Sequence, residues 1–111
     1  MNAHLSQSEF YILLSLAIKE RHGYEIMKQV ERDSEKKVIL GPGTLYGAIK
    51  RMLTSKIIIE VKGDNSRRKY YALTEKGRSS LSSELQRYRD AVELAERKKL
   101  FTNLGLVKLA L

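Results

Sequence analysis

Hydrophobic and polar positions follow helical periods in four stretches of the chain and strand-like patterns in two others. Apolar residues recur at helical spacing after Ser6-Gln-Ser-Glu9, which has the sequence of a capping box, and they predict a helix over residues 7–19. A second apolar stripe predicts a helix over residues 23–33. The polar run that follows it predicts a loop.

The third predicted helix has two distinct faces. It begins near Pro42, which suits a first helical turn. Its apolar positions fall on one side and are Leu45, Ile49, Met52 and Leu53. The opposite face is basic and carries small residues, namely Gly47, Lys50, Arg51 and Thr54, with Tyr46 at its edge. We expect the apolar stripe to hold the helix to the core while the basic face points outward.

Two residues on the outward face allow more than one interpretation. Glycine inside a helix costs about 1 kcal/mol relative to alanine. Gly47 therefore indicates either close approach to a phosphate backbone or a tight packing contact within the protein. Arg51 is a candidate for a contact with a base edge. Its alternative role is an ion pair with a carboxylate of the first or second helix.

A β-hairpin with a basic tip is predicted after the third helix. Residues 57–61 and 70–73 are rich in strand formers, and the polar run Gly63-Asp-Asn-Ser-Arg-Arg between them has the composition of a turn. A helix followed by a two-stranded ribbon with cations at its tip is typical of winged helix-turn-helix proteins. In such proteins the helix contacts base edges and the ribbon contacts phosphates.

The last predicted helix is capped by Thr74 and extends over about 25 residues. Gly77 lies in its first turns and weakens its start. An apolar seam of a/d type follows and consists of Leu81, Leu85, Tyr88, Val92 and Ala95. This helix either packs on its own domain or crosses to a second copy, and its length favours a dimer. The apolar tail, residues 100–111, folds back on the seam or docks on the partner, and Gly105 argues against one continuous helix.

The formal net charge of +8 is unevenly distributed. Residues 1–49 hold six basic and six acidic side chains, whereas residues 50–78 hold nine basic and three acidic ones, an excess of six. The excess therefore coincides with the third helix, the hairpin and the turn that follows. This clustering favours a polyanionic partner over a solvated basic face that binds nothing.

Several classes of function lack support in the sequence. There is no cysteine, so a disulfide framework and a thiolate zinc site are excluded. His4 and His22 lack the companions of a metal or catalytic site, and His22 is expected to cap or pack at the start of the second helix. No signal peptide, transmembrane helix or catalytic constellation stands out, so we expect a cytoplasmic protein that is neither an enzyme nor bound to a membrane and needs no cofactor or metal.

Four segments of the chain resemble the PadR family of winged-helix transcriptional regulators, and in particular its short subfamily. They are His22-Gly-Tyr-Glu-Ile26, Gly43-Thr-Leu-Tyr46, Leu53 before Ile57, and Arg68-Lys-Tyr-Tyr-Ala-Leu-Thr-Glu-Lys-Gly77-Arg. They follow one another with the family's order and spacing between about residues 8 and 81. Gly47 departs from the family pattern by replacing a common proline. Lys56 departs by replacing a common glycine, so this turn needs another backbone geometry or the lysine adds a phosphate contact.

The resemblance implies a dimeric repressor in which the first and last helices form the dimer interface. It also implies that a small molecule, often aromatic or cationic, releases the protein from its operator. The chain has no tryptophan, so any aromatic effector would have to stack on tyrosine or phenylalanine. Tyr46, the outward face of the third helix and the wing around Ser66 to Lys69 are the parts that the family resemblance places on DNA.

The sequence therefore predicts a mainly helical protein with a small β-hairpin. Residues 1–74 form a winged helix-turn-helix, and residues 75–111 form a long dimerisation helix with an apolar tail. The predicted contacts with double-stranded DNA are Thr44, Tyr46, Gly47, Lys50, Arg51, Thr54, Ser66, Arg67, Arg68 and Lys69. The predicted homodimer interface comprises Phe10, Leu14, Leu81, Leu85, Tyr88, Val92 and Ala95. Two-fold symmetry predicts an inverted-repeat operator with half-sites roughly 34 Å apart. The competing hypothesis is a dimeric protein-interaction module that has lost DNA binding.

Overall fold

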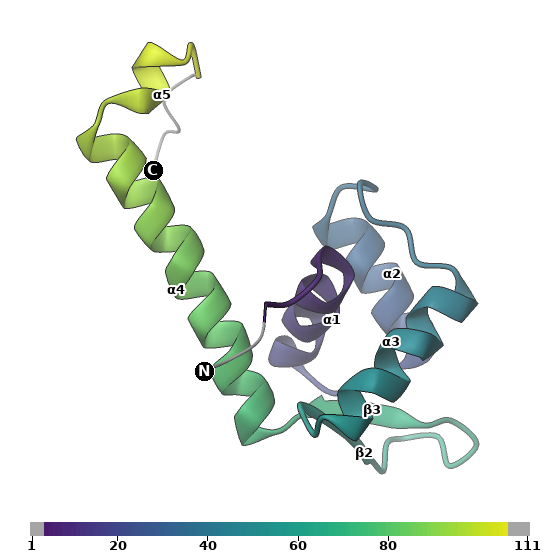
Figure 1. Cartoon of the computed structure of the whole chain (residues 1–111). Coiled ribbons are helices and arrows are strands. Elements are labelled where there is room, and N and C mark those ends of the chain that lie inside the picture. The colour runs from purple at the N-terminus through teal and green to yellow at the C-terminus, as the bar shows by residue number, and fades with distance from the viewer. Residues whose placement is uncertain (1–3, 107–111) are drawn as a thin grey trace.

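The computed structural model describes residues 4–106 and has the predicted fold class, mainly helical with a small antiparallel sheet (Figure 1). Its elements are α1 (Gln7–Ile18), β1 (Arg21–His22), α2 (Gly23–Asp33), α3 (Pro42–Thr54), β2 (Ile58–Val61), β3 (Tyr70–Leu73), α4 (Glu75–Arg97) and α5 (Leu100–Asn103). The predicted bounds of α2 match those of the structure, and α1 ends one residue earlier than predicted. The sequence patterns did not indicate β1 or α5.

Reciprocal caps define the starts of the first two helices. At α1, Glu9 N donates to Ser6 Oγ at 3.1 Å, and Ser6 N donates to Glu9 Oε1 at 2.9 Å. At α2, His22 N donates to Glu25 Oε1 at 3.1 Å, and Glu25 N lies 3.4 Å from His22 Nδ1. These boxes satisfy backbone donors that the first helical turn leaves unpaired. The predicted capping box at Ser6 and the predicted capping role of His22 are both confirmed.

The sheet has the strand order β1-β3-β2, so β3 is its central strand. Tyr71 pairs with Arg21 on one side and with Glu60 on the other. The two-residue strand β1 thus ties the α1–α2 connection to the predicted hairpin. The start of α2 consequently lies beside the hairpin, although more than 40 residues separate the two in sequence.

The hydrophobic core lies between α1, α2, α3 and the sheet. Its fully buried side chains include Ile12, Leu13, Ile26, Leu45, Met52 and Ile58. The two predicted faces of α3 are confirmed, because Leu45, Ile49 and Met52 are buried and Leu53 packs partly against the core. Lys50, Arg51 and Thr54 are exposed on the opposite face.

The first turn of α4 packs directly against the turn that joins α3 to β2. A Cβ atom added to Gly77 would lie 2.0 Å from the carbonyl oxygen of Ile57, so only glycine fits there. Thr74 Oγ1 accepts from Gly77 N at 3.0 Å and donates to the carbonyl of Lys56 at 2.6 Å. The low helix propensity of Gly77 is therefore the cost of a close contact between two elements.

Lys56 occupies a backbone conformation that favours glycine. Its φ angle is 63°, in the left-handed region, which costs a residue with a side chain roughly 1–2 kcal/mol. The turn therefore has a glycine-type backbone geometry with a lysine in place of glycine.

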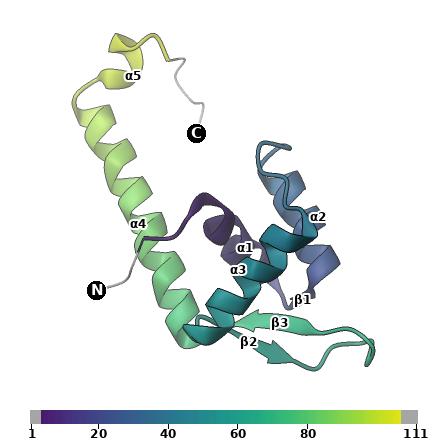
Figure 2. The same cartoon turned by 45° about the vertical axis from the view of Figure 1, so that its right-hand side comes forward.

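The long helix α4 leaves the base of the hairpin and projects away from the other helices, with α5 at its far end (Figures 1 and 2). Its first turns belong to the core, where Leu81 is only 5% exposed, whereas Val92 further along is 43% exposed. The helix ends at Arg97, before Lys99, whose φ angle of 56° breaks the helical path. The predicted interruption of the helix is confirmed, although it occurs before Gly105, and the tail from residue 107 onward lies outside the described residues.

Replacement of Gly77 by alanine should destabilise the protein by about 1–3 kcal/mol or more, the usual cost of overpacking, because the new methyl group meets a backbone carbonyl that cannot rotate away. Urea denaturation followed by circular dichroism measures this change. Gly43→Ala is the matched control, since a Cβ there has open space, and it should stabilise α3 by up to about 1 kcal/mol. Equal free energies of unfolding for the two variants would contradict the close contact at Gly77.

Candidate nucleic-acid interface

The outward face of α3 presents polar and cationic groups to solvent. Thr44, Tyr46, Lys50, Arg51 and Thr54 are exposed, and Tyr46 is about half exposed. A Cβ atom on Gly47 would meet only Arg51 Nη1, at an ordinary 3.6 Å, so the alternative of tight packing within the protein is wrong. Among the described residues, Arg51 forms no ion pair with a carboxylate of α1 or α2, so its alternative role is also wrong.

The tip of the hairpin is a compact polar turn. Arg67 N donates to Asn65 Oδ1 at 2.9 Å, and Arg68 N donates to the carbonyl of Asn65 at 3.0 Å. This Asx-type turn reverses the chain without help from the core. Ser66, Arg67, Arg68 and Lys69 are all exposed on it, as predicted.

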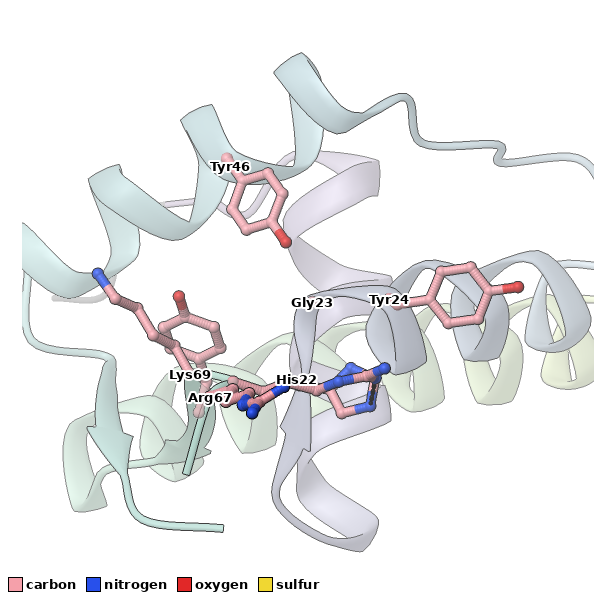
Figure 3. A pocket seen from close by; sticks show the side chains of 8 residues that line it. His22, Gly23, Tyr24, Tyr46, Arg67 and Lys69 are labelled. Atoms are coloured by element: carbon pink, nitrogen blue, oxygen red, sulfur yellow. Dashed lines mark hydrogen bonds between the residues drawn. The ribbon is translucent and has the colours of Figure 1, made fainter. Parts of the chain in front are cut away.

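A groove lies where α3, the start of α2 and the hairpin meet (Figure 3). Its volume is about 540 Å³. Its lining combines basic and aromatic side chains with one glycine and comprises His22, Gly23, Tyr24, Tyr46, Arg67, Arg68, Lys69 and Tyr71. Four of the ten predicted DNA contacts therefore line one groove, and they come from two separate elements.

The groove also contains four residues that sequence reasoning did not place at the interface. They are His22, Gly23, Tyr24 and Tyr71. His22 Nε2 lies 2.7 Å from Arg68 Nη1 and 3.3 Å from Glu25 Oε1. The motif His22-Gly-Tyr was visible in the sequence, but only the pairing of β1 with β3 brings it beside the hairpin.

The phenol of Tyr71 forms part of the wall between α3 and the sheet. Burial raises the pKa of Tyr71 above 10.0, and the nearby carboxylate of Glu60 and the hydroxyl of Tyr46 raise it further. Tyr71 therefore remains a neutral hydrogen-bond donor at neutral pH. Because the pKa of Tyr71 is higher in the folded than in the unfolded protein, the neutral phenol favours the folded state. This contribution to stability is fully present below pH 10.0 and is lost as the pH rises through the folded pKa.

The residues predicted for the dimer interface lie on α1 and α4, away from this groove. Phe10 and Tyr88 stack edge to face, with ring centroids 5.2 Å apart. Leu81 is part of the core and leaves little surface for a partner, whereas Leu85, Tyr88 and Val92 are exposed. The buried carboxylate of Glu84, which the seam pattern did not include, accepts from Tyr88 Oη at 3.0 Å and pairs with Arg87.

Two features are absent from residues 4–106. This part of the chain brings together no group of three or more histidine, cysteine, aspartate or glutamate side chains that could hold a metal ion. It also has no helix that is both long enough and apolar enough to cross a membrane.

The fold and the basic groove define a winged helix-turn-helix protein of the DNA-binding class. The Transcriptional regulator PadR-like family matches residues 12–83. The chain belongs to this family, as its sequence resemblance predicted, and it is a DNA-binding transcriptional regulator. The family and the fold are those of regulators and not of enzymes.

Similar proteins and solved structures include a regulator of this family. A PadR family transcription regulator from hypervirulent Clostridium difficile is 32% identical with a TM-score of 0.66, and the match covers 83% of this chain and 97% of that chain. A winged-helix DNA-binding protein from STIV has the same fold, with a TM-score of 0.68, 20% identity, and coverage of 81% and 96%. An uncharacterised protein of Lysinibacillus sphaericus is 29% identical over 89 residues, which are 77% of this chain and 82% of that protein.

Replacement of Glu60 by glutamine should lower the pKa of Tyr71, because it removes a negative charge that disfavours the phenolate. The pKa should nevertheless stay above 10.0, since burial is the larger cause. Phenolate absorbance during alkaline titration measures this, and the difference between each protein and its Tyr71→Phe counterpart isolates Tyr71. An unchanged pKa in the glutamine variant would contradict the proximity of Glu60.

Proposed function

We propose that the protein is a dimeric repressor that binds an inverted-repeat operator in double-stranded DNA and that a small aromatic molecule releases it. One observation supports this above the others. Cations of the hairpin tip line an exposed groove to which α3 contributes Tyr46, and Lys50 and Arg51 are exposed on the same helix. The arrangement suits a duplex, because α3 can enter a major groove while the hairpin tip contacts the flanking phosphates.

We assign separate roles to the candidate contacts. Lys50 and Arg51 contact base edges or nearby phosphates, and arginine prefers the O6/N7 edge of guanine. Arg67, Arg68 and Lys69 bind phosphate or enter a minor groove. Thr44, Tyr46, Gly47, Thr54 and Ser66 supply shorter contacts at the helix and the hairpin tip. Lys56 adds a further cation at the turn before β2.

Charge reversal by Lys50→Glu together with Arg68→Glu should abolish DNA binding and leave the dimer intact. In the unaltered protein, the logarithm of the DNA-binding constant should fall with the logarithm of the salt concentration with a slope near −5, if each dimer neutralises about six phosphates. Fluorescence anisotropy of labelled operator fragments at several salt concentrations measures both quantities. Lys36→Glu with Lys37→Glu is the matched control, because both lysines are exposed in the loop after α2 and the change of charge is the same. Unchanged binding by the first variant, or a slope near zero, would favour the interaction module without DNA binding.

We assign the homodimer interface to α1 and the outer turns of α4. The support is the apolar row of Leu85, Tyr88 and Val92 on a helix that projects beyond the rest of the protomer (Figure 2). Burial of such side chains yields about 1.5–3 kcal/mol each. We assign Phe10, which stacks on Tyr88, to the same surface together with Leu14 and Ala95, and the buried Leu81 anchors the base of the helix. This interface sets the distance between the two DNA-binding faces of the dimer. It therefore predicts half-sites about one turn of the DNA duplex apart.

Introduction of a charge at the seam by Val92→Glu should shift the protein to monomers, because two copies of the carboxylate would be buried close to the two-fold axis. Analytical ultracentrifugation measures the mass, and DNase footprinting should show loss of the paired half-sites. Leu94→Glu is the matched control, since Leu94 is also exposed, at 45%, but lies off the predicted seam. A Val92→Glu protein that remains dimeric would exclude this interface.

The proposed effector and cellular setting follow from family membership and from the aromatic residues present. Phe10 stacks against both Tyr11 and Tyr88 beside the proposed interface, so aromatic rings are available in place of tryptophan. We place the protein in the cytoplasm. Selection of bound fragments from random DNA, with and without candidate aromatic compounds, identifies the operator and the compounds that release it.

A further inference from the structure

The dipeptide His22-Gly23 touches candidate DNA contacts from two other elements. It joins β1 to α2 and lies at the centre of the groove lining (Figure 3). On one side Gly23 faces Tyr46 of α3, and on the other His22 faces Arg68 of the hairpin. Two adjacent residues of a third segment thus connect the two elements that carry the predicted DNA contacts.

Gly23 leaves the space in which the phenol of Tyr46 lies. A Cβ atom on Gly23 would be 2.4 Å from the hydroxyl oxygen of Tyr46 and 2.9 Å from the ring carbon that bears it. Both distances are too short for van der Waals contact, so any side chain at this position would displace the ring. Figure 3 shows the Tyr46 hydroxyl directed at Gly23 from α3 above. The position of Tyr46 therefore depends on the absence of a side chain at Gly23.

His22 holds Arg68 by a direct contact across the groove. A guanidinium group has only donors, so the 2.7 Å contact requires that His22 Nε2 accept from Arg68 Nη1. The ring proton of the neutral imidazole then lies on Nδ1. In this tautomer Nδ1 cannot accept from Glu25 N, so the α2 capping box keeps only the bond from His22 N to the Glu25 carboxylate. The imidazole is also held by its edge-to-face contact with Tyr70, at 5.3 Å between ring centroids.

We infer that His22 and Gly23 are positioning residues for DNA binding, which fix Arg68 and Tyr46 at the groove before DNA arrives. This inference rests on the proposed function. A long side chain that is already ordered loses less conformational freedom on binding, which is worth about two- to tenfold in affinity for each such side chain. His22 and Gly23 act through their neighbours, and neither needs to touch the nucleic acid.

Two double-mutant cycles test the inference by DNA affinity. Gly23→Ala should weaken binding about two- to tenfold, and it should have no further effect once Tyr46→Ala has removed the displaced ring. His22→Ala should weaken binding to a similar extent, and in an Arg68→Ala background only the part of that loss that comes from the α2 cap should remain. The cross pairs, Gly23→Ala with Arg68→Ala and His22→Ala with Tyr46→Ala, serve as matched controls and should be additive. Any loss of affinity due to the α2 cap itself is common to both backgrounds and cancels in the cycle.

The salt dependence separates positioning from direct contact. Arg68→Ala should make the log–log slope shallower by about one for each phosphate that the protein no longer neutralises. His22→Ala should leave the slope unchanged, because Arg68 still reaches its phosphate. A slope that falls with His22→Ala would assign the phosphate to His22 itself and overturn the inference.

Failure of folding and failure of DNA binding are distinguishable from failure of the inference. If Gly23→Ala does not fold, Gly23→Ala with Tyr46→Ala should restore the thermal transition, and lack of rescue would overturn the role of Gly23. Additive cycles in a protein that binds DNA would overturn the inference alone. Absence of binding by the unaltered protein would overturn the proposed function and the inference with it.

Discussion

The arrangement of this protein depends on the contact between the first turn of α4 and the turn that follows α3. Gly77 lies against the carbonyl of Ile57, and Thr74 bonds to the carbonyl of Lys56 while it caps α4. These contacts set the direction in which α4 leaves the winged domain. They also anchor the base of the hairpin, because β2 begins at Ile58, immediately after the same turn. The DNA-binding face and the proposed dimerisation helix thus meet at one close contact, and the distance between two DNA-binding faces in a dimer would follow from it.

The groove brings several positively charged side chains together, and the folded protein must offset their mutual repulsion. Arg67, Arg68 and Lys69 lie on an exposed tip, where water screens their mutual repulsion, and His22 offers a neutral acceptor to one of them. Carboxylates such as Glu25 and Glu60 lie close by and offset part of the positive potential. A polyanion that displaced water from this surface would gain from several cations that are already assembled.

The helix α4 combines two different environments along one apolar row. Gly77, Leu81 and Glu84 are buried within the protomer, and the carboxylate of Glu84 accepts from Tyr88 through Oε2 and pairs with Arg87 through Oε1, which accepts no hydrogen bond from the described residues. Leu85 and Val92, which continue the same heptad pattern, are exposed. The alternative in which the helix packs on its own domain therefore holds at its base, whereas contact of the exposed outer turns with a second copy stays a prediction. Heptad spacing reports which residues share a face, but it does not report where the neighbouring domain ends.

Local interactions explain which features the sequence alone determined. The start of α1 at its Ser6 cap, the bounds of α2 and the two faces of α3 follow from contacts between residues three or four positions apart, which sequence spacing records directly. The clustering of cations on α3 and the hairpin was equally visible. Only the tertiary structure decided that β1 pairs with β3, that Gly77 meets Ile57 and that His22 and Gly23 face Arg68 and Tyr46. The members of each pair lie far apart in the sequence, and the packing of the core, which no local pattern encodes, brings them together.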